Sequence, residues 1–115
     1  MTTVDECVIE VVRRGLDDWV QAAEVVSVAQ SIGGQTTSAA TQRVALEVIG
    51  ELLRSGLMQA GGVTKDGFSE WSMSWDEAFE KIASEWEGLG RLPNLGELCW
   101  LSNTSKGDQL AQSVR

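Results

Sequence analysis

One stretch, Ser38 to Met58 (SAATQRVALEVIGELLRSGLM), constrains the fold of this 115-residue chain more than any other. Its apolar residues recur at the spacing that lines one face of an α-helix: Val44, Ala45, Val48, Ile49 and Leu52. Gly56 can adopt the left-handed conformation that commonly ends helices. The apolar residues after it favour a strand. The sequence therefore predicts a long amphipathic helix that turns directly into a short strand.

Further elements are predicted from capping residues, glycine breaks and apolar periodicity. Two capping boxes are expected, Thr3–Glu6 and Ser74–Glu77, and Asp18 is a favourable N-cap between them. The other predicted helices span about 4–14, 19–31 and 75–89, with a short last helix capped by Asn103 or Thr104. The predicted strands span 57–60, 68–73 and 97–101. This order predicts a single α+β domain over residues 1–115 that is mostly helical.

Charge and hydropathy limit the classes of function. The net charge of −8 repels nucleic-acid phosphate on average, so a macromolecular partner is expected to be a basic protein. The same acidity can also serve solubility alone. No apolar run approaches the roughly 20 residues of a membrane-spanning helix, and the acidic N-terminus lacks the features of a signal peptide. We therefore expect a cytoplasmic protein that does not contact a membrane.

The residue types present offer little support for catalysis. Histidine is absent, which removes Ser-His-Asp, Cys-His and histidine-ligand mechanisms. Cys7 and Cys99 lie in apolar surroundings without CxxC spacing, so buried free thiols are expected rather than a disulfide or a zinc site. The pair Asp76/Glu80 is one helical turn apart and can hold a hard cation, but solvated helix faces show the same pattern. We expect no enzyme activity, no cofactor and no bound metal.

Two strings, taken with the order of the elements, resemble the winged-helix superfamily. Residues 52–58, LLRSGLM, are similar to the "LL-x-x-GL" exit from the recognition helix of such proteins. Residues 100–111, WLSNTSKGDQLA, are similar to their "WxLTxxG" return from the wing into a closing helix. The resemblance covers about residues 4–111 and implies a three-helix core with a small antiparallel sheet. The chain departs from the family at about 68–96, where an extra helix is inserted in the wing.

The resemblance implies a DNA-reading surface at the start of the long helix. The matching positions are Ser38, Thr41, Gln42 and Arg43. Only Arg43 among them is basic, and Glu47 and Glu51 further along the helix oppose phosphate. The inserted helix is acidic as well. A transcriptional regulator that binds duplex DNA and dimerises through its terminal helices is therefore the alternative function, and charge disfavours it.

Tryptophan is the most unusual feature, with five residues in a chain that has no tyrosine. Three are expected in the core: Trp19, Trp86 and Trp100. Trp71 and Trp75 flank a strand–helix junction in the insert, beside the acidic residues Asp76 and Glu80. We predict that this junction contacts a partner protein, with Trp71 favoured because Trp75 continues the buried stripe of its helix. The predicted function is a protein-interaction module, in its sharpest form an acidic antitoxin, immunity or regulatory protein that masks a basic partner.

Overall fold

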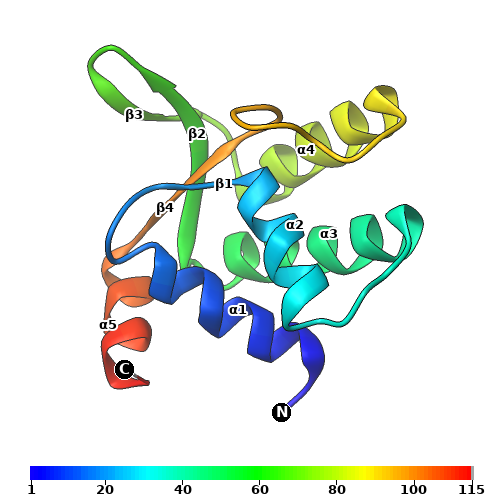
Figure 1. The fold of residues 1–115 in the computed structure, drawn as a ribbon. Coiled ribbons are helices and arrows are strands. Elements are labelled where there is room, and N and C mark those ends of the chain that lie inside the picture. Colours follow the sequence, from blue (N-terminus) through cyan, green and yellow to red (C-terminus); the bar gives the residue numbers. More distant parts are fainter. Residues whose placement is uncertain (115) are drawn as a thin grey trace.

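The structure, a computed structural model, describes residues 1–114 and confirms a mostly helical α+β fold. Along the chain lie α1 (Thr3–Arg14), β1 (Val20–Gln21), α2 (Ala22–Ser31), α3 (Ser38–Arg54), β2 (Met58–Thr64), β3 (Gly67–Glu70), α4 (Trp75–Leu89), β4 (Trp100–Asn103) and α5 (Ser105–Ser113). A helix, α4, lies between β3 and β4, where the sequence predicted one, and runs beside α3 (Figure 1).

The four strands form one antiparallel sheet in the order β1-β4-β2-β3. Its register places Val20 opposite Leu101, and Leu101 opposite Ala60. All three side chains are buried, so this face of the sheet covers the core. The neighbouring positions Gln21, Trp100 and Gly61 point to the other side, which we call the outer face of the sheet.

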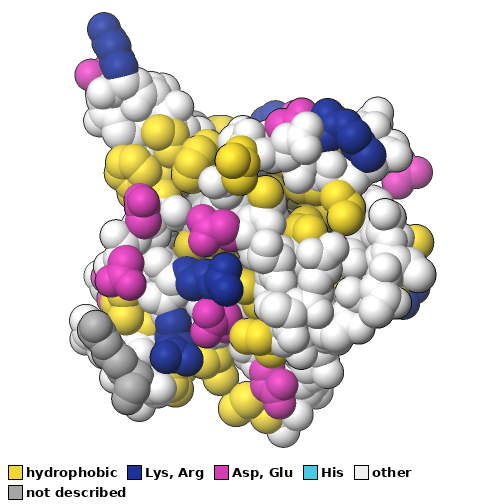
Figure 2. Space-filling model, viewed as in Figure 1, with side chains coloured by type: hydrophobic (Ala, Val, Ile, Leu, Met, Phe, Trp, Pro, Cys, Tyr) yellow, Lys and Arg dark blue, Asp and Glu magenta, His cyan; other side chains and the backbone are white. Residues whose placement is uncertain are grey.

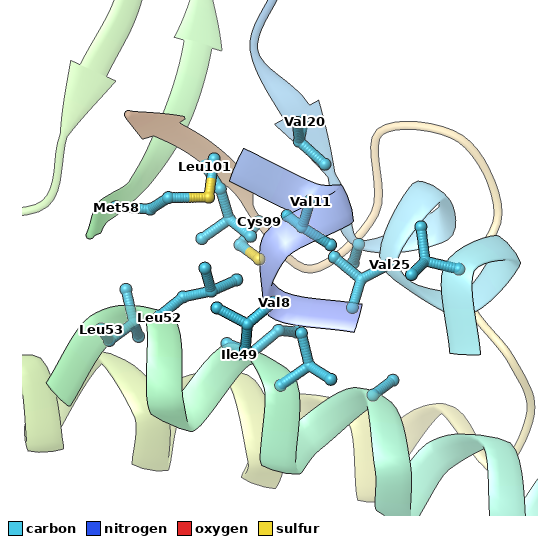
Figure 3. Close-up of a cluster of buried hydrophobic side chains, with 14 of the residues drawn as sticks. Val8, Val11, Val20, Val25, Ile49, Leu52, Leu53, Met58, Cys99 and Leu101 are labelled. Carbon is cyan, nitrogen blue, oxygen red and sulfur yellow. The ribbon is translucent and has the colours of Figure 1, made fainter. Parts of the chain in front are cut away.

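The core lies between this sheet and the first three helices. The apolar stripe of α3 packs at its centre, and Ile49 and Leu52 are fully buried there. Val8 and Val11 of α1 approach it from one side and Val25 of α2 from another (Figure 3). The long helix predicted from apolar spacing is therefore the element on which the others pack.

The two strings that carry the family resemblance meet in space. Gly56 ends α3 with a φ of 70°, and Leu57 turns back into the core, where it is buried. Thr104, at the start of α5, donates its hydroxyl to the Gly56 carbonyl at 2.6 Å, and its backbone N–H donates to the Leu57 carbonyl at 3.0 Å. The exit from α3 and the entry to α5 therefore form one hydrogen-bonded junction.

Two capping boxes occur, one of them displaced from its predicted position. The Ser74–Glu77 box is confirmed, with the Ser74 backbone N–H donating to the Glu77 carboxylate at 3.0 Å. The first box is formed by Thr2 and Asp5 instead of Thr3 and Glu6. Adjacent threonines followed by adjacent acids offer two registers for such a box, and spacing alone did not distinguish them.

The second helix begins later than predicted. Val20 belongs to a strand because its side chain packs opposite Leu101 in the core. α2 therefore starts at Ala22, and Asp18 accepts a hydrogen bond from the adjacent Trp19 N–H at 2.7 Å instead of capping a helix. Tertiary pairing with β4 overrides the helical signal at this point.

The strand boundaries also differ from prediction. β2 continues to Thr64, and β3 ends at Glu70 rather than Met73. β4 begins at Trp100 rather than at residue 97, because Leu98 has a positive φ of 72°, which is incompatible with an extended strand. The hairpin thus reaches further from the sheet than the sequence indicated.

Candidate protein-binding groove

Trp75 is the exposed aromatic residue of the insert. It lies in the first turn of α4 on the same stripe as Ala78, Ile82 and Trp86, which are buried. The core surface that covers this stripe ends before the first turn of α4, so Trp75 remains 45% exposed. Trp75 borders a groove on one side and a smaller hollow on the other.

The groove runs over α3 between the starts of α1 and α4, and we call it the α1–α3–α4 groove. It measures about 560 Å³. Its lining residues are Thr2, Val4, Glu47, Gly50, Glu51, Arg54, Trp75 and Phe79. Gly50 forms part of the floor, and its missing side chain lets Phe79 of α4 approach closely: a Cβ on residue 50 would lie 3.1 Å from the ring. The walls at Val4, Trp75 and Phe79 are apolar.

Carboxylates surround this apolar surface. Glu51 accepts from the Arg54 guanidinium at 2.5 Å and from the Ser55 hydroxyl at 2.7 Å. The bond from Ser55 and, next in size, the bond from Arg54 lower the pKa of Glu51 below its usual value, so this carboxylate stays charged. Glu47 is exposed and has no ion-pair partner within residues 1–114. Because Arg54 is held by Glu51, the groove presents unbalanced negative charge.

Trp71, the favoured contact residue of the sequence prediction, is not the exposed one. It is half-buried against the core, in the smaller hollow of about 200 Å³ where β2, β3 and the start of α4 meet. The Lys81 ammonium lies 4.8 Å from its ring centroid, so the chain's own cation already occupies one face of the ring. Trp71 was favoured over Trp75 because Trp75 was expected to be the more buried of the two, and that expectation was wrong.

Asp76 and Glu80 lie on the solvent face of α4, next to the groove rather than in it. The Ser74 hydroxyl donates to Asp76 at 2.6 Å, and this bond lowers the pKa of the Asp76 carboxyl. Asp76 follows Trp75 directly and adds negative charge at that end of the groove. Glu80, one turn further along, belongs to the exposed surface of the same helix.

The proposed DNA-reading residues do not share one exposed surface. Ser38 and Arg43 are exposed and Gln42 is half-buried. Thr41 is fully buried, because it lies one turn before Ala45 on the core stripe of α3. Its inclusion in a DNA-contacting set was wrong.

The cysteines are free and buried, in agreement with the prediction. Burial raises the pKa of the Cys99 thiol to about 12 and also raises that of Cys7. Both thiols are therefore protonated and weak nucleophiles at neutral pH. Within residues 1–114, no three His, Cys, Asp or Glu side chains gather as metal ligands, and none of the described helices is long and apolar enough to cross a membrane.

Comparison of the chain with protein-family models, with curated proteins and with solved structures finds no match. The groove itself is thus the basis for assigning a function. Sequence reasoning missed its floor and two walls, Gly50, Val4 and Phe79, because they come from three different helices. The one local signal was Gly50, a glycine inside a strongly helical pattern that marks a close packing contact.

Proposed function

We propose that this chain is a non-enzymatic protein-interaction module that binds a basic protein through the α1–α3–α4 groove. The observation that carries the proposal is Trp75, a tryptophan 45% exposed between two hollows and flanked by carboxylates. Aromatic anchors dominate the binding energy of protein interfaces. The net charge of −8 speeds encounter with a basic partner and opposes association with an acidic one.

The sharpest form of this proposal is an acidic protein that masks a basic partner, in the manner of an antitoxin or immunity protein. We further propose that the fold is a winged helix with α4 inserted in the wing. The element order from α1 to α5 and the junction of Thr104 with Gly56 and Leu57 support this assignment. A winged helix that has gained such a groove can bind proteins without retaining a DNA-binding role.

The alternative, a transcriptional regulator that reads duplex DNA, has the element order in its favour. The exposed stripe of α3 argues against it. α1 and α4 flank the helix, and the stripe left between them carries Arg43, Glu47, Glu51 and Arg54. Its two basic residues are matched by two acidic ones, whereas DNA binding needs net positive charge at the phosphates.

The two functions separate in a direct experiment. The tagged chain is used to isolate its partner from an extract of the source cells, and the purified partner is then titrated against wild type, Trp75→Ala and Ile32→Ala. Ile32 is similarly exposed but lies at the end of α2, away from the groove. Trp75→Ala is expected to weaken binding at least about tenfold, while Ile32→Ala stays near wild type and both variants keep the fold.

Equal affinity of Trp75→Ala and wild type would contradict the proposal. The regulator alternative predicts a mobility shift of duplex DNA at low salt that disappears as salt rises. Such a shift, lost in Arg43→Ala, together with no protein partner, would favour the regulator over the module.

A further inference from the structure

The β2–β3 hairpin projects from the body of the protein (Figure 1). β4 pairs with β2 only as far as Gly61, so residues 62–69 continue as a two-stranded ribbon that turns at Lys65 and Asp66. Isolated ribbons are marginally stable in water. Trp19 braces this one, with its ring centroid 6.2 Å from that of Phe68. The hairpin is thereby held in place although one of its strands is an edge.

The outer edge of β3 carries unpaired backbone groups. The Trp71 N–H donates to the Ala60 carbonyl at 3.0 Å, and hydrogen-bonded pairs alternate along an antiparallel ladder. Given the register, the bonded pairs are then Ala60 with Trp71, residue 62 with 69, and residue 64 with 67. Phe68 and Glu70 therefore direct their N–H and C=O groups away from β2, toward the open edge of the sheet.

The outer face beside this edge is apolar, although the outward face of an antiparallel sheet is commonly polar. Val63 and Phe68 are directly opposite each other on this face. The side chains of Val63 and Trp19 are 38% and 37% exposed, which corrects the prediction that Trp19 is a core residue. Figure 2 shows hydrophobic side chains gathered where the hairpin leaves the body.

The charge around the edge is negative. Asp66 and Glu70 are exposed at the two ends of β3. Lys65 at the tip is the one basic residue of the hairpin, residues 58–70. A second copy of this chain would bring like charges together, whereas a cationic segment would be attracted.

We propose that the open edge of β3 binds an extended, cationic segment of a partner protein as a fifth strand of the sheet. Strand addition would satisfy the outward N–H and C=O groups of Phe68 and Glu70. On the outer face, an apolar side chain of the segment would lie against Phe68 and a basic one, two residues away, beside Glu70. This surface is separate from the α1–α3–α4 groove, so either proposal can fail without the other.

The test uses a synthetic peptide that repeats the unit Lys-Thr-Val-Thr, with glutamate in place of lysine in the control peptide. Amide hydrogen exchange is followed by NMR with each peptide present. Strand addition predicts that the amides of Phe68 and Glu70 become protected by the lysine peptide, while those of Gly67 and Ser69, already in the ladder, change little. The glutamate peptide is expected to give no protection.

Two variants at one position separate charge from backbone bonding. Glu70→Gln removes the charge and keeps the N–H, so binding is expected to weaken a few-fold. Glu70→Pro also removes an N–H that points to solvent, a position where edge strands tolerate proline, and binding is expected to disappear. Equal binding by Glu70→Pro and Glu70→Gln would overturn the proposal. The wild-type protein alone can also overturn the proposal. It would do so if the lysine peptide protected amides outside β3 instead, or if the lysine and glutamate peptides protected the same amides equally.

Discussion

The ring of Phe79 packs against the bare Cα of Gly50, and a methyl group at residue 50 would lie 3.1 Å from its Cε1 atom. This contact lets α4 approach α3 closely and leaves the floor of the α1–α3–α4 groove open. In a helix interior, glycine costs about 1 kcal/mol relative to alanine. A glycine at this point therefore gives up helix stability in exchange for a close helix–helix contact.

Substitution of Gly50 tests the groove from its floor. Gly50→Ala is expected to change the free energy of unfolding by less than about 1 kcal/mol, because the propensity gain offsets crowding against Phe79. Gly50→Leu is expected to cost about 1–3 kcal/mol and, by filling the groove, to weaken partner binding at least about tenfold. Urea titration and a binding titration measure the two effects. Full affinity in a folded Gly50→Leu protein would show that the partner does not enter the groove.

Gly107 and Gly88 form a matched pair of helical glycines. A Cβ at Gly107 would lie 2.1 Å from the Leu57 carbonyl oxygen, so alanine must displace α5 from the end of α3. A Cβ at Gly88 meets nothing within 4 Å. We expect Gly107→Ala to destabilise the fold by about 1–3 kcal/mol and Gly88→Ala to stabilise it by up to about 1 kcal/mol. Urea titrations of both variants check this, and shifts of the same sign would refute the close contact at Leu57.

Features set by residues close together in the sequence were predictable, whereas contacts between distant residues were not. The length of α3, its end at Gly56 and the Ser74–Glu77 box depend on residues within one or two turns of each other, and all three were predicted. Gly107 lies in the string 100–111 that carries the winged-helix resemblance. A glycine is needed there because the carbonyl of Leu57, distant in the sequence, lies too close for a side chain. The sequence pattern therefore identified Gly107, but only the packing of α5 against the end of α3 explains why this residue is a glycine.

The errors share one physical cause. A helical stripe shows which side chains point inward but not how far the surface beneath them extends. Trp75 lies on the buried stripe of α4 and is exposed because its partner surface ends, while Thr41 is polar and yet buried by α3 packing. Trp19 was assigned to a helix that begins three residues later, and it braces the hairpin instead. The sequence prediction named both Trp71 and Trp75, but it ranked Trp71 first, whereas Trp75 is the more exposed of the two.

The ion pair between Arg91 and Glu97, in the loop between α4 and β4, makes the stability of the fold depend on pH. The Arg91 guanidinium donates to both carboxylate oxygens of Glu97, at 2.8 and 3.0 Å, and the Asn94 backbone N–H donates to the same carboxylate at 2.6 Å. The bond from Arg91, followed by that from Asn94, lowers the pKa of Glu97 to about 2. The folded value is below the usual 4.5, so ionised Glu97 stabilises the fold above pH 4.5, and this stability is lost as pH falls toward 2.

Glu97→Gln is therefore expected to lose less stability than wild type when the pH falls from neutral to about 2. Part of the acid-induced loss of stability is expected to remain in this variant. That remainder comes from the other carboxylates whose pKa values are lowered: Asp5, Glu51, Asp76 and Glu77. Urea midpoints measured at neutral pH and near pH 2 for wild type, Glu97→Gln, Arg91→Gln and the double variant give the comparison. The pair is solvent-exposed, so added salt should reduce the difference. Arg91 acts through Glu97, whereas Glu97 also accepts from the Asn94 N–H. The double variant should therefore resemble Glu97→Gln, and Arg91→Gln alone should have a smaller effect. Additive effects of the two substitutions would mean that Arg91 acts independently of Glu97.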